Sequence, residues 1–214
     1  MRIVITGANR GIGAALAAGY ANAGWDVIAT SRNGSTGVAL DVSKPESVAA
    51  FAGSLSDQPI DLLVCNAGVY DDKGQTLSDG YPAQMWADTF AVNVTGVFLT
   101  VQAMLPRLRQ ADSAKLAIIS SQMASHTRAP GGSYIYRASK AAALNLGRNL
   151  ASDLRPDGIA VGIYHPGWVK TDMGGGAADI TVAQATSGLM ARFDDLSVET
   201  TGCFETWDGR AHAY

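Results

Sequence analysis

The chain has 214 residues, of which 47% are hydrophobic and 16% charged, so it has enough apolar surface for a folded domain and is not an intrinsically disordered chain. The formal net charge is -3 with no run of Lys or Arg, which gives no basis for binding nucleic acid or an anionic membrane, and no apolar run reaches membrane-spanning length. Cys65 and Cys203 lack the spacing of a zinc site or disulfide framework, so we expect no metal, one domain over residues 1–214 and a cytoplasmic location.

Short β-branched runs alternate with longer Ala- and Leu-rich segments, which is typical of an α/β fold with helices on both faces of a parallel sheet. Several of the runs are apolar without alternation, as buried parallel strands are. We expect seven strands, at residues 2–6, 26–31, 38–41, 61–65, 115–120, 159–164 and about 203–206. The pattern therefore predicts a doubly wound, Rossmann-type sheet.

Apolar residues between the strands recur at steps of three and four, as on the buried face of a helix. Leu16 and Tyr20 share such a face in the first helix, and two long helices are expected around 83–108 and 133–154. Only residues 32–37 separate the second and third strands, too few for a crossover helix. We expect a bare return along the sheet there and a sheet face without its usual helix.

A glycine-rich turn, TGANRGIG from Thr6 to Gly13, follows the first strand and opens the first helix. Free N–H groups and the helix dipole favour a dinucleotide pyrophosphate at such a junction, and glycines allow close backbone approach. A plain strand-to-helix turn is the alternative, because 24 glycines make chance matches easy. We predict a cofactor site formed by Gly7, Asn9, Arg10, Gly11, Ile12 and Gly13.

Tyr136 and Lys140 are four residues apart and would share one face of a helix, which brings an ammonium near a phenol. A free phenol has a pKa of about 10, and lowering it by roughly three units would allow proton exchange near neutral pH. A neighbouring cation is the simplest cause of such a shift. The pair therefore predicts acid–base chemistry, although this spacing also arises by chance. Tyr134 is the competing phenol, but Ala138 gives it no lysine partner.

Together these motifs resemble the short-chain dehydrogenase/reductase family. The glycine turn is similar to the pattern TGxxxGxG, the CNAG run at 65–68 to NNAG, and YRASK at 136–140 to YxxxK. The stretches 132–140 and 206–209 look like the compact subgroup with C-factor and sniffer-type carbonyl reductases. Departures are Cys65 in place of the first Asn, the missing crossover helix and a short C-terminal region; they affect the substrate prediction rather than the chemistry.

The resemblance implies a catalytic set of four residues. Tyr136 exchanges the proton, and Lys140 also holds the nicotinamide ribose. Ser121 orients the substrate oxygen, although Ser120 competes for this role. Asn93 anchors a water that links the lysine to solvent, or is merely a polar group inside a helix.

The resemblance also implies further cofactor contacts. They are Asp41 and Val42 at the adenine, Asn66, Ala67 and Gly68 after the fourth strand, and Pro166, Gly167, Val169 and Thr171 near the nicotinamide. Asp41 could instead cap the following helix. The glycine-rich segment 174–177 could be a lid hinge or only a linker.

Cofactor choice is indicated by the end of the second strand. Proteins that choose NAD usually place an acidic residue there, which would repel a 2′-phosphate. This chain has Ser31 and Arg32, and Arg10 could approach the same phosphate. We therefore predict NADPH, the alternative being that both arginines are solvated surface residues.

We predict an NADPH-dependent oxidoreductase that interconverts a small-molecule carbonyl compound and its alcohol, with no nucleic-acid or membrane partner. Apolar side chains favour a hydrophobic substrate: Met123, Tyr134, Trp168 and Met173. Small outward residues on the two long helices resemble the family's dimer faces and predict a homo-oligomer, a dimer or tetramer. A non-catalytic cofactor-binding regulatory or signalling protein is the alternative, and the intact Ser-Tyr-Lys set argues against it.

Overall fold

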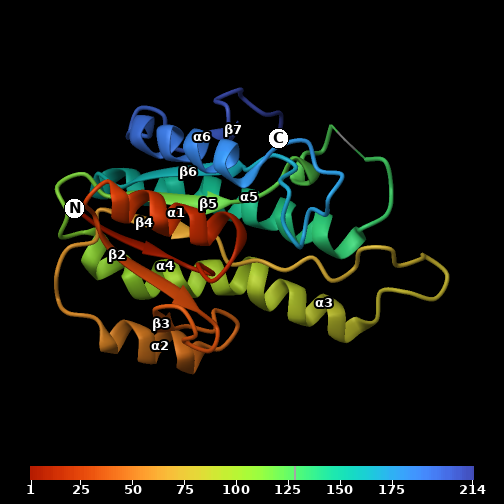
Figure 1. The fold of residues 1–214 in the computed structure, drawn as a ribbon, viewed down its shortest axis with the longest axis horizontal. Coiled ribbons are helices and arrows are strands. Elements are labelled where there is room, and N and C mark those ends of the chain that lie inside the picture. The colour runs from red at the N-terminus through yellow and green to blue at the C-terminus, as the bar shows by residue number, and fades with distance from the viewer. Residues whose placement is uncertain (128) are drawn as a thin grey trace.

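The computed structural model of the protein describes residues 1–127 and 129–214. Its centre is one seven-stranded sheet with the order β3-β2-β1-β4-β5-β6-β7, in which neighbouring strands run parallel (Figure 1). The strands are β1 (Arg2–Ile5), β2 (Asp26–Ser31), β3 (Val38–Ala39), β4 (Leu62–Cys65), β5 (Lys115–Ile119), β6 (Ala160–His165) and β7 (Phe204–Thr206). The predicted doubly wound fold is confirmed, and each expected strand is present.

Helices cover both faces of the sheet because alternate strand residues point to opposite sides. On one face lie α1 (Gly11–Asn22) and α6 (Val182–Asp195), whose buried side chains include Leu16 and Phe193. The other face carries α2 (Pro45–Ser54), α4 (Gly96–Leu108) and α5 (Tyr134–Leu154). Shorter elements are α3 (Ala83–Phe90), the π-helical turn η1 (Ala91–Thr95) and the 3-10 turns η2 (Gln122–Ala124) and η3 (Arg155–Asp157).

The connection between β2 and β3 contains no helix, as predicted, but it does not return along the sheet. Thr30 and Ser31 at the end of β2 pair directly with Val38 and Ala39. The chain between them makes only a tight loop, in which Gly37 has a φ of +72° and a Cβ would lie 2.0 Å from a backbone oxygen of β2. The expected strand at 38–41 is therefore only two residues long.

The expected helix at 83–108 is a rod made of α3, η1 and α4. By length and composition it is apolar enough to cross a membrane, which corrects our expectation that no apolar run reaches that length. Val101 and Met104 of α4 are buried in the domain core, whereas Phe98 is exposed. One such helix is weak evidence for a membrane span, and one face of α4 packs in the domain core.

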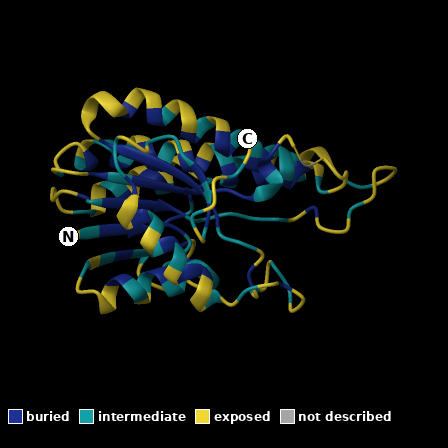
Figure 2. Ribbon diagram, turned by 90° about the horizontal axis from the view of Figure 1, so that it is seen from above, coloured by how far each residue is buried: buried dark blue, intermediate teal, exposed yellow. Residues whose placement is uncertain are grey.

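The parallel strands bring their carboxyl ends to one edge of the sheet, where ligands of doubly wound folds bind. Buried residues concentrate in the strands, whereas exposed residues lie on the outer helix surfaces and on the long loops beyond this edge (Figure 2). The segment 69–82, between β4 and α3, is one of these loops (Figure 1). The fold thus places the turns after β1, β2, β4, β5 and β6 around one cleft.

Candidate active site

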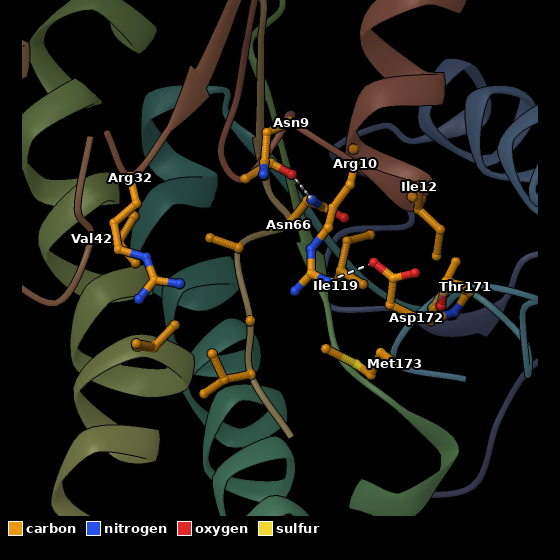
Figure 3. A pocket seen from close by; sticks show the side chains of 18 of the residues that line it. Asn9, Arg10, Ile12, Arg32, Val42, Asn66, Ile119, Thr171, Asp172 and Met173 are labelled. Carbon is orange, nitrogen blue, oxygen red and sulfur yellow. Dashed lines mark hydrogen bonds and ion pairs between the residues drawn. The ribbon is translucent and has the colours of Figure 1, made fainter. Parts of the chain in front are cut away.

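A cleft of about 760 Å³ lies at the carboxyl edge of the sheet (Figure 3). Most of the predicted cofactor-binding residues and the Tyr-Lys pair line it: Gly7, Asn9, Arg10, Gly11, Ile12, Gly13, Arg32, Asp41, Val42, Asn66, Ala67, Gly68, Tyr136, Lys140, Pro166 and Thr171. Five predicted site residues do not line it: Ser31, Asn93, Ser121, Gly167 and Val169. Residues far apart in the sequence therefore meet in one place.

The glycine turn packs directly against the chain that leaves β4. Gly7 has a φ of +65°, and a Cβ there would lie 2.9 Å from the Cα of Ala67. A Cβ on Gly13 would lie 2.3 Å from the Gly7 carbonyl oxygen. The Asn66 side-chain amide donates to the Thr6 and Gly7 carbonyl oxygens, at 2.9 and 3.0 Å. Glycine is thus required at both positions by close backbone packing.

The first turn of α1 fits a phosphate group. Its N-cap residue, Arg10, makes no side-chain cap, and the turn carries no acidic residue. The N–H groups at a helix N-terminus and the positive end of the helix dipole favour an anion. With the glycines of the turn beside it, this end of the cleft suits the pyrophosphate of a dinucleotide cofactor.

The two arginines of the cleft lie in different environments. Arg10 Nη1 is 2.7 Å from the Asp172 carboxylate, and this ion pair lies away from Arg32 (Figure 3). In the described part of the chain Arg32 has no ion pair of its own. Both arginines line the cleft, and Arg10 is paired here with Asp172 of the loop after β6, so a phosphate shared by Arg10 and Arg32 stays a prediction.

Ser31 differs from the prediction. Its side chain is buried, and its hydroxyl accepts from the Thr36 N–H and donates to the Thr36 carbonyl oxygen, both at 3.1 Å. The hydroxyl thus closes the loop between β2 and β3 and does not point into the cleft. Asn33 and Ser35 of this loop line the cleft instead. Their position just after Arg32 was the only sequence signal for them.

Asp41 lies at the cleft and does not cap the following helix. It lines the cleft beside Val42. Its carboxylate also accepts hydrogen bonds from the Ser43 N–H and hydroxyl, at 3.1 and 2.7 Å. The N-cap of α2 is Lys44, so Asp41 stabilises the turn before the helix rather than capping it.

Tyr136 and Lys140 are both buried and lie on one face of α5, with the lysine Nζ 5.7 Å from the phenol ring centre. Burial lowers the pKa of Lys140 to about 8, and its Nζ donates to the Ile119 carbonyl oxygen at 3.0 Å. Burial raises the pKa of Tyr136 to about 12. This direction is opposite to our expectation, because removal of the phenolate from water outweighs the nearby ammonium, which is directed at a backbone carbonyl.

The structure distinguishes the two serines after β5. The Ser120 hydroxyl donates to the Lys140 carbonyl oxygen at 3.0 Å and so holds the helix backbone. A hydrogen bond from Ser121 acts on Tyr136, where it favours the phenolate and opposes the rise in pKa. The Ser121 oxygen also accepts from the Met123 N–H at 3.1 Å. Ser121 is therefore the serine placed against the phenol.

The Asn93 side chain makes three hydrogen bonds within the protein. It accepts from the Val69 N–H and donates to the Val69 carbonyl oxygen, both at 2.9 Å, and donates to the Ser139 hydroxyl at 3.0 Å. These bonds match the alternative in which Asn93 is a polar group inside a helix. A Cβ on Gly68 would lie 3.3 Å from both the Asn93 Oδ1 and the Lys140 Nζ. Asn93 thus fixes the chain after β4 beside the lysine.

The loop after β6 is held by its own hydrogen bonds. The Thr171 hydroxyl accepts from the Gly174 N–H at 3.1 Å, and the Trp168 Nε1 donates to the Gly174 carbonyl oxygen at 2.8 Å. Val169 is buried and forms a bridge to residue 180, and Gly167 packs against residues 180 and 207. Further lining residues that we did not predict are Leu40, Ser43, Val69, Val92, Ile119, Lys170, Asp172 and Val182. Of the four apolar side chains expected at the pocket, Met173 lines the cleft, whereas Met123, Tyr134 and Trp168 do not, and Ser120, the competing serine, also lines it.

A doubly wound sheet with a glycine turn at its first βα junction and a buried Tyr-Lys pair at the same edge defines a dinucleotide-dependent oxidoreductase. Residues 1–179 match the family model described as short chain dehydrogenase. The chain belongs to the short-chain dehydrogenase family.

Known relatives agree with this membership. The chain is 39% identical to "C-signal" of Myxococcus xanthus over 161 residues, which cover 75% of this chain and 96% of that protein. It is 34% identical to "1-hydroxy-2-glutathionyl-2-methyl-3-butene dehydrogenase" of Rhodococcus sp. (strain AD45) over 225 residues, which cover 97% and 96% of the two chains.

Solved structures are similar over the whole chain. The NADPH-bound carbonyl reductase from chicken fatty liver has a TM-score of 0.91 and 29% identity, with 100% of this chain and 98% of that chain covered. The carbonyl reductase Sniffer of D. melanogaster has a TM-score of 0.91 and 27% identity, with coverages of 100% and 99%. The predicted resemblance to the subgroup with C-factor and sniffer-type carbonyl reductases is confirmed.

Proposed function

We propose that the protein uses NADPH to interconvert a carbonyl compound and its alcohol. The observation that carries the proposal is a buried phenol, Tyr136, beside Lys140 and Ser121 at the edge of a cleft suited to a dinucleotide. Arg32 at the cleft supports the choice of NADPH, as does the NADPH-bound carbonyl reductase among the similar structures. A regulatory protein that only binds the cofactor would have no use for a buried proton donor.

The residues of the chain have separate tasks in this mechanism. When bound, the nicotinamide supplies or accepts the hydride. Tyr136 gives its proton to the substrate oxygen during carbonyl reduction, and its raised pKa keeps the phenol protonated at neutral pH. Ser121 orients the substrate oxygen next to the phenol. Lys140 binds the ribose of the cofactor, and the first turn of α1 binds the pyrophosphate.

We also propose that the substrate is an apolar carbonyl compound. Trp168 and Met173, in the loop after β6, are 46% and 38% exposed, and Met173 lines the cleft. Exposed apolar side chains beside a polar reaction site provide a surface for an apolar ligand. Tyr134 contributes less than expected, because its ring packs against Tyr81 with the ring centres 5.2 Å apart.

The Tyr136→Phe variant tests the proposed function. We expect turnover to fall by about a hundredfold to ten-thousandfold, the usual contribution of a general acid, while NADPH binding stays nearly unchanged. Loss of reduced-nicotinamide absorbance is followed with a panel of ketones, aldehydes and quinones, and binding is followed by NADPH fluorescence. Tyr134→Phe is the matched control, since it removes a phenol two residues away, and should retain full activity. Substantial activity in Tyr136→Phe would refute the assignment.

A further inference from the structure

The first turn of α5, which carries Tyr136, is capped by a residue from a distant segment. Asp72 is fully buried, and its carboxylate accepts hydrogen bonds from the N–H groups of Ile135 at 2.9 Å and of Tyr136 at 3.2 and 3.3 Å. The local N-cap residue, Ser133, has a left-handed φ of 49° and makes no side-chain cap. The helix end thus depends on Asp72, more than 60 residues earlier in the chain.

The segment 69–82 makes further contacts to the same helix turn. The Tyr70 ring stacks on the Tyr136 ring with their centres 4.2 Å apart and an angle of 22° between their planes. The Tyr70 hydroxyl is hydrogen-bonded to the Ser133 hydroxyl at 2.6 Å. The Tyr81 hydroxyl accepts from the Ser133 N–H at 3.2 Å. This segment therefore holds both the backbone and the ring of Tyr136.

We propose that Asp72 is a positioning residue of the active site, whose buried carboxylate fixes the first turn of α5 and holds Tyr136 in place as a protonated acid. The proposal rests on the proposed function, in which Tyr136 is the proton donor. Two physical effects support it. Two hydrogen bonds to one carboxylate fix the backbone at the residue that bears the phenol. The negative charge also occupies the positive end of the α5 dipole, which would otherwise stabilise a phenolate.

The groups facing Tyr136 decide how its protonation responds to Asp72. Burial has the largest effect on the phenol, and Tyr70 and Asp72 both raise the pKa of Tyr136. The Lys140 ammonium faces the ring from α5 itself, and Ser121 opposes the rise from the chain after β5. Removal of the Asp72 charge should therefore make the phenol more acidic. A purely structural cap would instead change stability without changing this ionisation.

Asp72→Asn tests the proposal, with Asp71→Asn as the matched control because Asp71 is the exposed neighbour with the same charge. We expect kcat to fall by about tenfold to a hundredfold through misplacement of the acid, with KM and NADPH affinity nearly unchanged. The pH profile of alcohol oxidation should shift to lower pH, as expected for loss of a nearby negative charge. Ultraviolet absorbance of the cofactor-free protein should show the Tyr136 phenol ionising at correspondingly lower pH, with Tyr136→Phe as the reference. Asp71→Asn should leave these quantities unchanged.

An unshifted profile and phenol titration in Asp72→Asn, or an equal shift in Asp71→Asn, would overturn the proposal. If Asp72→Asn fails to bind NADPH, Asp72→Ser takes its place, because it removes the charge and keeps a hydroxyl acceptor. Loss of NADPH binding in both variants would also overturn it, since Asp72 would then be needed for the whole fold. The proposed function is tested separately: substantial activity in the Tyr136→Phe variant would refute it, whatever the Asp72 variants show.

Discussion

Replacement of the buried lysine by a neutral side chain of similar length should stabilise the protein while removing its activity. Burial lowers the pKa of Lys140 from 10.5 to about 8, so the unfolded chain holds this proton more tightly than the folded chain. At 1.36 kcal/mol per pKa unit, the protonated lysine destabilises the fold by about 3 kcal/mol at pH 7. Lys140→Met also loses the hydrogen bond to Ile119, which contributes about 1 kcal/mol. The expected net gain is about 2 kcal/mol, or roughly 4–8 °C in Tm for a chain of this size.

The sign of the pH dependence is fixed by the same proton. Unfolding takes up a proton between pH 8 and about 10.5, so the Lys140 contribution to the free energy of unfolding rises with pH in that window. Burial raises the pKa of Cys65 to about 12, so the Cys65 contribution to the free energy of unfolding falls as the pH rises above 9. The lysine contribution is therefore isolated by comparing wild type with Lys140→Met, since both contain Cys65. The advantage of Lys140→Met should therefore disappear by about pH 10.

Urea denaturation of wild type and Lys140→Met at pH 7 and pH 10 measures this difference. Lys73→Met is the matched control because Lys73 is exposed, and it should show no change in relative stability between the two pH values. If the difference in free energy of unfolding between wild type and Lys140→Met stays constant from pH 7 to pH 10, the reasoning is refuted. It would mean that Lys140 is as well solvated in the folded protein as in the unfolded chain.

Arg32→Ala should reduce the preference for NADPH over NADH by about tenfold to a hundredfold, since a hydrogen bond to a charged group contributes roughly 1.5–3 kcal/mol. Arg10→Ala should reduce this preference less, because Asp172 already pairs with Arg10. The ratio of kcat/KM with NADPH to kcat/KM with NADH measures the preference, and an equal loss of preference in the two variants would contradict the prediction. We also expect a homo-oligomer formed through the outward faces of α4, where Phe98 is 43% exposed, and α5. Light scattering should return a multiple of the 22.2 kDa chain mass, and the monomer mass throughout the micromolar range would contradict this prediction.

The features that were predicted from the sequence depend on local patterns. The strands are apolar runs bounded by turn residues, and Leu16 and Tyr20 of α1 are buried as their spacing predicted. Gly7 and Gly13 were predicted because a turn between strand and helix limits side-chain size whatever surrounds it. The short link before β3 also excluded a helix by length alone.

The features that were not predicted depend on partners far away in the sequence. The raised pKa of Tyr136 follows from its burial, and the spacing of residues in the sequence does not predict that burial. Arg10 is paired with Asp172, which lies 162 residues later in the chain. The bonds between Asn93 and Val69 join two segments that meet only after β4 and the rod 83–108 have packed together. A motif can thus identify a residue while leaving its partners open.

The link between Asp72 and α5 has a consequence for the order of folding. The contact closes a loop of 63 residues, and loop closure of this length has an entropic cost of about 4 kcal/mol before any contact compensates for it. We expect parallel pairing of β4 with β5 to bring the two segments together before the first turn of α5 is secured. We therefore expect Tyr136 to reach its final place during refolding only after most of the helical and sheet structure has formed. The glycine turn also depends on a distant partner, because the Asn66 amide that donates to the Gly7 carbonyl oxygen lies 59 residues later, so we expect both parts of the proposed site to be completed late in folding.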